Sequence, residues 1–285
     1  MNFTDKITYH FLKTISKVIG KFSLQSQVVI SQHIASILYH YIPKRKKVAI
    51  KNLKTAFPEY SDIWIQNTLK KCYKFFIYNF IQFLAFPKST DSIKIQINGQ
   101  VALDNALEKG KGVILISAHF GAWEILGHWL GVNNYPLRGV AQRQKNKGAN
   151  KFFEEKRQLS GIKHIYRKVG MDVLYNILKE NKILGLVSDQ DAKNKGIFVN
   201  FFNTPASTHK GAAIFHLNTS APMIFGLCIQ TGFQEYKIEL IPIIPVNNTI
   251  EDITKQYTLT LEKIIRKYPE QNFWFHNRWK TTLMK

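Results

Sequence analysis

From about residue 93 onward, short apolar runs alternate with segments of helical periodicity, and this rhythm limits the fold more than any other feature. The clearest run, at 112–117, reads Gly-Val-Ile-Leu-Ile-Ser, as expected of a buried strand. Strands and helices in this alternation predict an α/β fold with a mostly parallel sheet flanked by helices. We expect strands at 93–97, 112–117, 137–142, 163–166, 183–188, 196–202, 222–230 and 235–243, and helices at 101–109, 122–130, 149–159, 170–180 and 252–267.

The first part of the chain follows a different, helical pattern. Apolar side chains recur at helical spacing over residues 7–19, with lysines largely on the other faces. Such a helix is suited to lie in a membrane interface, although an ordinary surface helix has the same pattern. We therefore predict a membrane-associating helical region at 1–90 and an α/β domain at 91–285.

The most apolar stretch lies at 75–86, in a helix that begins near Ser61 or Asp62. Its twelve residues include Asn79 and Gln82, whereas a helix that spans a bilayer needs about twenty apolar residues. We expect a buried or interfacial helix here, and a protein that is peripheral or monotopic at most. No secretory signal is expected either, because lysines interrupt the first twenty residues.

The chain is strongly basic, with a formal net charge of +21. Residues 1–90 carry fourteen of the Lys and Arg side chains against three acidic ones, and four of the basic residues are consecutive at 44–47. A surface of this kind suits an anionic partner: a membrane surface, a phosphorylated substrate, an acidic carrier protein or nucleic acid. A merely soluble basic surface is the alternative.

Composition and motifs exclude several classes of protein. A hydrophobic content of 45% excludes a disordered chain. Cys72 and Cys228 lie far apart, so neither a disulfide framework nor a zinc site is indicated. The chain has no G-x-S-x-G, G-x-G-x-x-G, H-E-x-x-H or phosphate-binding loop motif, which argues against serine lipases, dehydrogenases, zincins and NTPases. We expect no cofactor and no metal.

A histidine and a glutamate stand where the strand at 112–117 passes into the next helix. His119 follows the strand, and Glu124 lies five positions later, in the expected first helical turn. Sites of α/β sheets lie at the carboxyl ends of strands. The pair supplies an imidazole that can take a proton and a carboxylate that can hold its tautomer. In the alternative, His119 is a buried strand-end histidine and Glu124 a helix N-terminal charge.

Polar residues follow two further strands. Asp189 and Asp191 come after the strand at 183–188, which we expect to end near His119. Arg143 follows the strand at 137–142, and Arg157 comes fourteen residues later; arginine suits bidentate contacts with phosphate or carboxylate. Each of these could equally be a solvated surface charge or a helix cap.

Six motifs in order make residues 40 to 282 resemble the bacterial lipid A biosynthesis acyltransferases, the lauroyl and myristoyl transferase family. The motifs are Asn52-Leu53 with Phe57-Pro58-Glu59, HFGAWE, Arg143 with Asn146, Arg157 before Gly161, Asp189-Gln190-Asp191, and FVNFFNTPAST with the terminal FWFHNRWKT. Departures from the family pattern are Asn203 in place of a common glycine, a loop after Asp191 without glycine, and an N-terminal segment without a strongly apolar anchor.

The resemblance implies a glycerolipid-acyltransferase-like fold and transfer of an acyl group from an acyl carrier protein to a hydroxyl of a lipid A precursor. It places the reaction at the cytoplasmic face of the inner membrane. His119 and Glu124 fall on its catalytic H-x4-D/E motif, and Arg143, Asn146, Arg157, Asp189 and Asp191 on or near positions for substrate binding.

We expect His119 to act as general base, with Glu124 orienting it. Donors from the turn after His119, or an arginine, would stabilise the oxyanion. Two alternatives stay open: another lipid or glycolipid acceptor, and a non-catalytic basic protein that binds membranes or nucleic acid. The chain has no nucleic-acid motif, so no nucleic-acid partner is expected.

Overall fold

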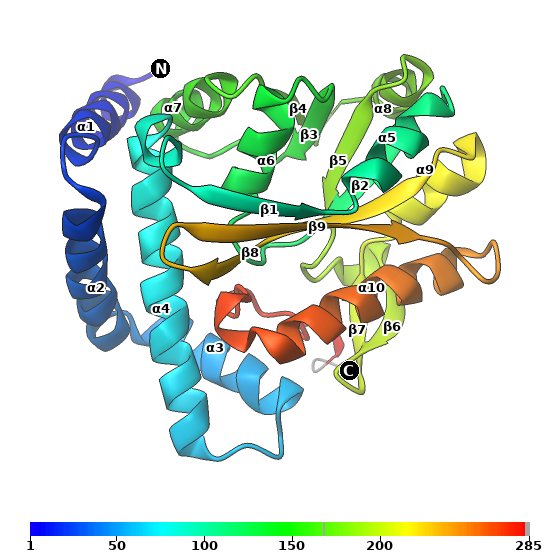
Figure 1. Ribbon diagram of the computed structural model, residues 1–285. Helices are drawn as coiled ribbons and strands as arrows, with labels where there is room; N and C mark the ends of the chain where they lie inside the picture. The colour runs from blue at the N-terminus through cyan, green and yellow to red at the C-terminus, as the bar shows by residue number, and fades with distance from the viewer. Residues whose placement is uncertain (168, 283–285) are drawn as a thin grey trace.

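The computed structural model describes residues 1–167 and 169–282. The strands of its main sheet are β1 (Lys94–Asn98), β2 (Val113–Ser117), β3 (Leu137–Ala141), β4 (Lys163–Tyr166), β5 (Ile183–Val187), β8 (Met223–Gly232) and β9 (Glu235–Ile243). Their order is β1-β9-β8-β2-β5-β3-β4 (Figure 1). β8 and β9 pair antiparallel, and the other neighbours pair in parallel. The predicted mostly parallel α/β sheet is therefore confirmed.

Helices cover both faces of the sheet because its central strands are apolar on both sides. In β2, Ile114 and Ile116 belong to the buried core with α8 (Met171–Lys179), α9 (Gly211–Thr219) and α10 (Ile250–Lys267). Val113 and Leu115 alternate with them and belong to the core on the other face, with α5 (Gln100–Glu108) and α6 (Trp123–Val132). This alternation is the period of two expected of a strand.

The expected strand at 196–202 lies outside the main sheet. β6 (Ile197–Phe201) pairs antiparallel with β7 (Thr204–Thr208) in a separate hairpin. Phe202 and Asn203 form its two-residue turn, with φ of 51° and 57°. Asn203, which stands where the family has a common glycine, therefore does adopt the left-handed conformation that asparagine tolerates. Neither β7 nor α9 was among the expected elements.

Four helices form the N-terminal region: α1 (Phe3–Ile19), α2 (Leu24–Tyr41), α3 (Pro43–Ala56) and α4 (Asp62–Ala85). α4 runs beside the sheet and α2 packs along it (Figure 1). Its N-cap is Ser61, as one of the two predicted alternatives, with the side chain accepting from the Trp64 N–H. Ala49, Leu53 and Leu69 share one buried core with β2. The division of the chain at residue 90 stays a prediction.

The C-terminal aromatic segment docks on the domain. Trp274 and Trp279 are buried, and the main-chain N–H of Phe273 donates to the carbonyl oxygen of His119 at 3.0 Å. Within residues 1–167 and 169–282, no helix combines the length and the apolar composition needed to cross a bilayer. This holds for α4, which contains residues 75–85 of the most apolar stretch and ends at Ala85.

Candidate active site

His119 and Asp189 meet at the carboxyl-terminal ends of two neighbouring strands. β2 and β5 pair in parallel, with Ser117 opposite Val187 at their ends. His119 comes two residues after one strand and Asp189 two residues after the other. The imidazole Nδ1 lies 2.9 Å from Oδ1 of Asp189. Neighbouring strand ends thus bring together two side chains that are seventy residues apart in the sequence.

The turn after His119 fits closely against β8 and the C-terminal segment. Gly121 has a φ of +62°, and a Cβ there would lie 2.0 Å from the carbonyl oxygen of Cys228. The Gly121 N–H donates to the Gln271 carbonyl at 2.8 Å, and the Ala122 N–H donates to the Cys228 carbonyl at 2.7 Å. These two N–H groups are committed to main-chain bonds. The oxyanion donor expected from this turn is therefore neither of them.

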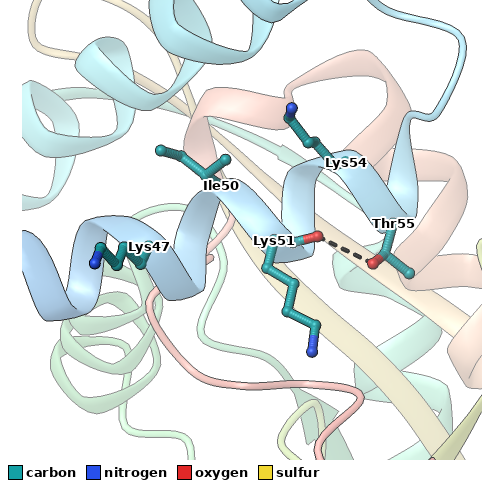
Figure 2. A pocket seen from close by; sticks show the side chains of 5 residues that line it. All are labelled: Lys47, Ile50, Lys51, Lys54 and Thr55. Carbon is teal, nitrogen blue, oxygen red and sulfur yellow. Dashed lines mark hydrogen bonds between the residues drawn. The ribbon is translucent and has the colours of Figure 1, made fainter. Parts of the chain in front are cut away.

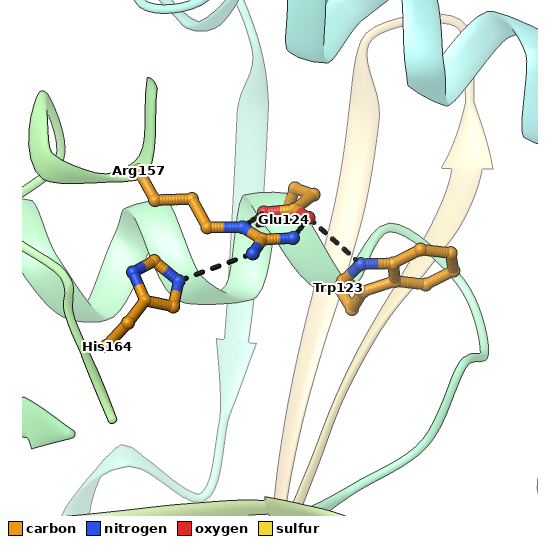
Figure 3. Close-up of polar contacts among 4 residues, drawn as sticks. All are labelled: Trp123, Glu124, Arg157 and His164. Carbon is orange, nitrogen blue, oxygen red and sulfur yellow. Dashed lines mark hydrogen bonds and ion pairs between the residues drawn. The ribbon is translucent and has the colours of Figure 1, made fainter. Parts of the chain in front are cut away.

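Glu124, in the first turn of α6, binds Arg157 near the end of α7 (Lys147–Gln158), as Figure 3 shows. Nε of Arg157 lies 2.9 Å from Oε2, and Nη2 lies 2.5 Å from Oε1. This is the bidentate geometry of a strong arginine–carboxylate pair. The indole Nε1 of Trp123 donates to the same carboxylate at 3.2 Å, and Nη1 of Arg157 lies 3.3 Å from Nε2 of His164.

The hydrogen bond to the imidazole that we expected from Glu124 is thus made by Asp189. The physical reason is the strand order, which places the end of β5 beside His119, whereas the first turn of α6 presents Glu124 to α7. Glu124 still acts on His119 through its charge. Burial lowers the pKa of His119, but the carboxylates of Asp189 and Glu124 outweigh it, so the pKa lies above its ordinary value of 6.5.

The electrostatics of Asp189 complete this ion pair. Burial raises the pKa of its carboxyl group, and the adjacent imidazole of His119 more than compensates, so the net pKa is lowered. Asp189 therefore stays ionised when His119 takes a proton, as a carboxylate that stabilises an imidazolium must. The His119 side chain is 33% exposed and the Asp189 side chain only 12%, so the imidazole is the more accessible member of the pair.

A largely apolar cavity of about 380 Å³ lies beside His119. Its polar lining consists of His119, Glu124 and Arg157 together with the amides of Asn79 and Gln82. Sequence reasoning placed residues 75–86 in a buried or interfacial helix and missed that this helix, α4, forms a wall of the cavity. The recurrence of phenylalanine at helical spacing was the available signal. The aromatic lining consists of Phe76, Phe80, Phe83, Phe86, Trp123, Phe153 and Phe273.

Three predicted substrate-binding residues, Arg143, Asn146 and Asp191, do not line the His119 cavity. The exposed guanidinium of Arg143 stacks 4.3 Å above the Tyr166 ring. Asn146 is the N-cap of α7 and accepts from the Ala149 N–H at 2.8 Å. Oδ2 of Asp191 accepts from the Thr281 hydroxyl at 2.8 Å. These contacts lie within the protein, and a substrate contact of Arg143, Asn146 or Asp191 stays a prediction.

We did not predict from the sequence a second polar layer, which lies behind the His119–Asp189 pair. Arg278 is buried, and it donates to the Ser207 carbonyl at 2.6 Å and to Oγ1 of Thr208 at 2.5 Å. Arg278 and Asp189 line the same small cavities. Burial lowers the pKa of Arg278 to about 10, which leaves it cationic at neutral pH. Its charge helps to offset that of the buried carboxylate.

The residues that the structure describes hold no group of three or more His, Cys, Asp or Glu side chains that could bind a metal. Burial raises the pKa of both cysteine thiols, Cys72 and Cys228, which disfavours the reactive thiolate. His119, paired with Asp189 beside the apolar cavity, is a side chain of this site that can exchange a proton.

The chain is similar to known acyltransferases. The chain matches the family described as bacterial lipid A biosynthesis acyltransferase over residues 4–281. The chain belongs to this family. It is 22% identical over 255 residues to the lipid A biosynthesis palmitoleoyltransferase of Escherichia coli, covering 87% of this chain and 83% of that protein.

Two phosphatidylinositol mannoside acyltransferases are also similar to this member of the lipid A acyltransferase family. The Mycobacterium tuberculosis protein is 29% identical over 148 residues, which are 49% of this chain and 47% of that protein. The Mycolicibacterium smegmatis protein is 29% identical over 123 residues, or 42% and 40%. The chain thus spans about half the length of these relatives or less. Family membership confirms the resemblance drawn from the motifs.

Proposed function

We propose that the protein is an O-acyltransferase that moves an acyl chain from an acyl carrier protein thioester to a hydroxyl of a lipid A precursor, in a late, secondary acylation. The observation that carries the proposal is the His119–Asp189 pair, 2.9 Å apart, at the polar lining of an apolar cavity. A largely apolar cavity with few polar groups suits a fatty acyl chain whose reactive end lies at His119. Membership of the acyltransferase family supports the reaction class.

His119 carries the proton transfers. Its Nδ1 is bonded to Asp189, so Nε2 accepts the proton of the acceptor hydroxyl. The hydroxyl oxygen then forms a bond to the thioester carbonyl carbon. As the tetrahedral intermediate collapses, the C–S bond breaks and the imidazolium returns its proton to the leaving thiolate. The acyl ester and the carrier thiol are the products, and no acyl-enzyme forms.

Glu124 and Arg157 form the second functional pair of this proposal. Arg157 has five N–H donors, and the contacts of the described residues engage three of them. The other two can serve an oxyanion or an anionic group of the glycolipid at the cavity. Glu124 fixes the guanidinium plane and adds negative charge near His119, which favours the imidazolium.

The proposed site of action is the cytoplasmic face of the inner membrane, with peripheral or monotopic binding. α1 supports it: Phe3, Ile7, Phe11 and Val18 are exposed along one helix that also carries exposed lysines. Exposed apolar side chains flanked by lysines are typical of helices that lie in an anionic membrane interface. The acceptor, itself a membrane glycolipid, would then reach the cavity from the bilayer.

The test is acyl transfer by the purified protein, read by mass spectrometry, with acyl carrier protein thioester and lipid A precursor. His119→Ala should lower the turnover by about a hundredfold or more, as loss of a general base does. Circular dichroism of the variant serves as the control for folding. Near-normal turnover by folded His119→Ala protein would contradict the assignment of the base.

A second acceptor deserves the same assay, because the mannoside acyltransferases are among the similar proteins. A mannosylated phosphatidylinositol can replace the lipid A precursor in an otherwise identical reaction. Product from this glycolipid alone would keep the His119 chemistry and replace the proposed acceptor. Salt-sensitive DNA binding without any acyl transfer would instead favour the non-catalytic alternative.

A further inference from the structure

An open groove of about 470 Å³ lies on one face of α3 (Figure 2), and it shares no lining residue with the His119 cavity. Lys47, Lys51 and Lys54 line it with Ile50 and Thr55. Figure 2 shows the three ammonium groups spread along the helix. This surface takes no part in the chemistry proposed for His119.

The charged side chains of α3 are all positive. α3, Pro43–Ala56, contains six Lys and Arg residues and no Asp or Glu. Lys54 has one acidic neighbour, Asp62, with Nζ 2.7 Å from Oδ1, and both side chains are more than half exposed. Such a surface pair is weak, so the groove keeps a strong positive potential that would attract and orient an acidic surface.

A hydrated acidic protein suits this face better than a bilayer. Basic segments that bind membranes combine lysines with exposed apolar anchors. Within α3 itself no large apolar side chain is exposed, and the nearest exposed ones, Tyr41, Ile42, Tyr60 and Ile63, lie beyond its two ends. Apolar anchors of this kind lie on α1 and α2, at Phe3, Phe11 and Ile37 among others.

The inner face of α3 reaches the active site. Asn52 is buried, and its amide donates to the carbonyl oxygens of Trp274, at 2.7 Å, and of His276, at 2.5 Å. Asn52 also lines a small cavity together with Asp189. A partner bound in the α3 groove would therefore stand one helix away from the catalytic pair.

We propose that the α3 groove is the docking site for the carrier protein that delivers the acyl thioester, through an acidic surface of that carrier. The identity of the occupant rests on the proposed function, whereas the surface itself rests on charge, shape and its position beside the active-site segment. Because the contacts are between exposed charges, salt should weaken the complex steeply.

The experiment titrates acyl carrier protein against the immobilised full-length protein at low and at high salt. Lys47→Glu with Lys51→Glu should raise the Kd about tenfold or more, because like charges then face each other. The matched control is Lys255→Glu with Lys263→Glu on α10, the same charge change at two exposed lysines, and should bind as the wild type does. Lys47→Gln with Lys51→Gln should give an intermediate Kd.

Each possible result of this experiment either supports or overturns the docking site. Equal carrier binding by wild type and the α3 variant, or no binding by the wild type, would overturn the docking site. So would a loss of binding to phosphatidylglycerol–phosphatidylethanolamine vesicles with carrier binding intact, which would assign α3 to the membrane. Carrier binding that follows the expected pattern, with no acyl transfer to any acceptor, would keep the docking site and refute the proposed function.

Discussion

At the scale of single residues, one carboxylate of the site pairs with a histidine and the other with an arginine. Asp189 bonds to His119 at 2.9 Å, and Glu124 holds Arg157 in a bidentate pair. Each carboxylate thereby holds its partner side chain in a fixed orientation, while both raise the pKa of His119. The two acids therefore have distinguishable effects on the pH dependence of catalysis.

Asp189→Asn should lower kcat/KM by about a hundredfold or more, because the imidazole loses its oriented partner. His119 must be neutral to accept a proton, so activity rises with pH through its pKa, which lies above 6.5 in the wild type. Removal of the carboxylate charge lowers that pKa. The acidic limb of the kcat/KM profile should therefore move to lower pH.

The pH profile of Glu124→Gln should be compared with that of Asp189→Asn. The Glu124→Gln substitution removes a charge that raises the pKa of His119 but leaves the bond to Asp189 in place. The acidic limb should move in the same direction, by less than in Asp189→Asn. An unchanged limb in Asp189→Asn would show that His119 is not the base that titrates.

Gly121→Ala should destabilise the fold. The added Cβ would lie 2.0 Å from the Cys228 carbonyl oxygen, at a φ of +62°. Strain and overpacking together should cost about 2–4 kcal/mol, which lowers the Tm by about 5 °C or more. The control is Gly110→Ala, where φ is +68° but nothing lies within 4 Å. Similar Tm losses in both variants would mean that conformation, rather than the close approach, requires the glycine.

At the scale of elements, α4 connects the N-terminal region with the site. Its Ser61 cap fixes where the helix begins, and its later turns place Phe76, Phe80 and Phe83 along the cavity. The same helix therefore contributes both to the core and to the proposed acyl pocket. Arg157 approaches the cavity from another element, near the end of α7.

Phe80→Ala should widen the acyl pocket. The Phe80 side chain is 41% exposed, and its ring centroid lies 6.4 Å from that of Phe153 across the lining. We expect the ratio of kcat/KM for longer over shorter acyl donors to rise about tenfold, since added methylenes gain room. Phe233→Ala, at an exposed aromatic outside the cavity lining, should leave the ratio unchanged. Equal ratios in wild type and Phe80→Ala would exclude this wall from chain selection.

At the scale of the whole molecule, the exposed apolar and charged surfaces are separate. The apolar stripe lies on α1, and the basic groove without apolar anchors lies on α3. α1 packs on α7, where Gly148 allows its backbone to approach that of Asp5 closely. A molecule arranged in this way can meet a bilayer with one surface and a soluble carrier with another.

Phe3→Ser combined with Phe11→Ser should weaken binding to anionic vesicles about tenfold or more, because each buried aromatic side chain contributes about 1.5–3 kcal/mol. These side chains are 78% and 61% exposed. Transfer to an acceptor in detergent micelles should be unaffected. Val101→Ser with Val246→Ser, two exposed sites away from α1, is the control in a vesicle sedimentation assay. Unchanged vesicle binding by the phenylalanine variant would remove α1 as the membrane contact.

The local sequence was sufficient for much of this architecture. Apolar runs that alternate with helical segments predicted the strands and their parallel sheet. A strand that is buried on both faces requires apolar side chains at successive positions. The same runs placed His119 and Asp189 at strand ends. Local patterns missed β7 and α9, whose short segments acquire their structure from the hairpin partner and from the core.

By itself, the sequence determined which side chains stand at the ends of β2 and β5, since that depends on where each apolar run stops. Only the tertiary structure decided how they pair. Asp189 rather than Glu124 meets His119 because β5 is the neighbour of β2. Glu124 meets Arg157 because α7 returns past α6, thirty-three residues further along the chain. Strand order and helix packing arise from burial over the whole molecule, which no local spacing records.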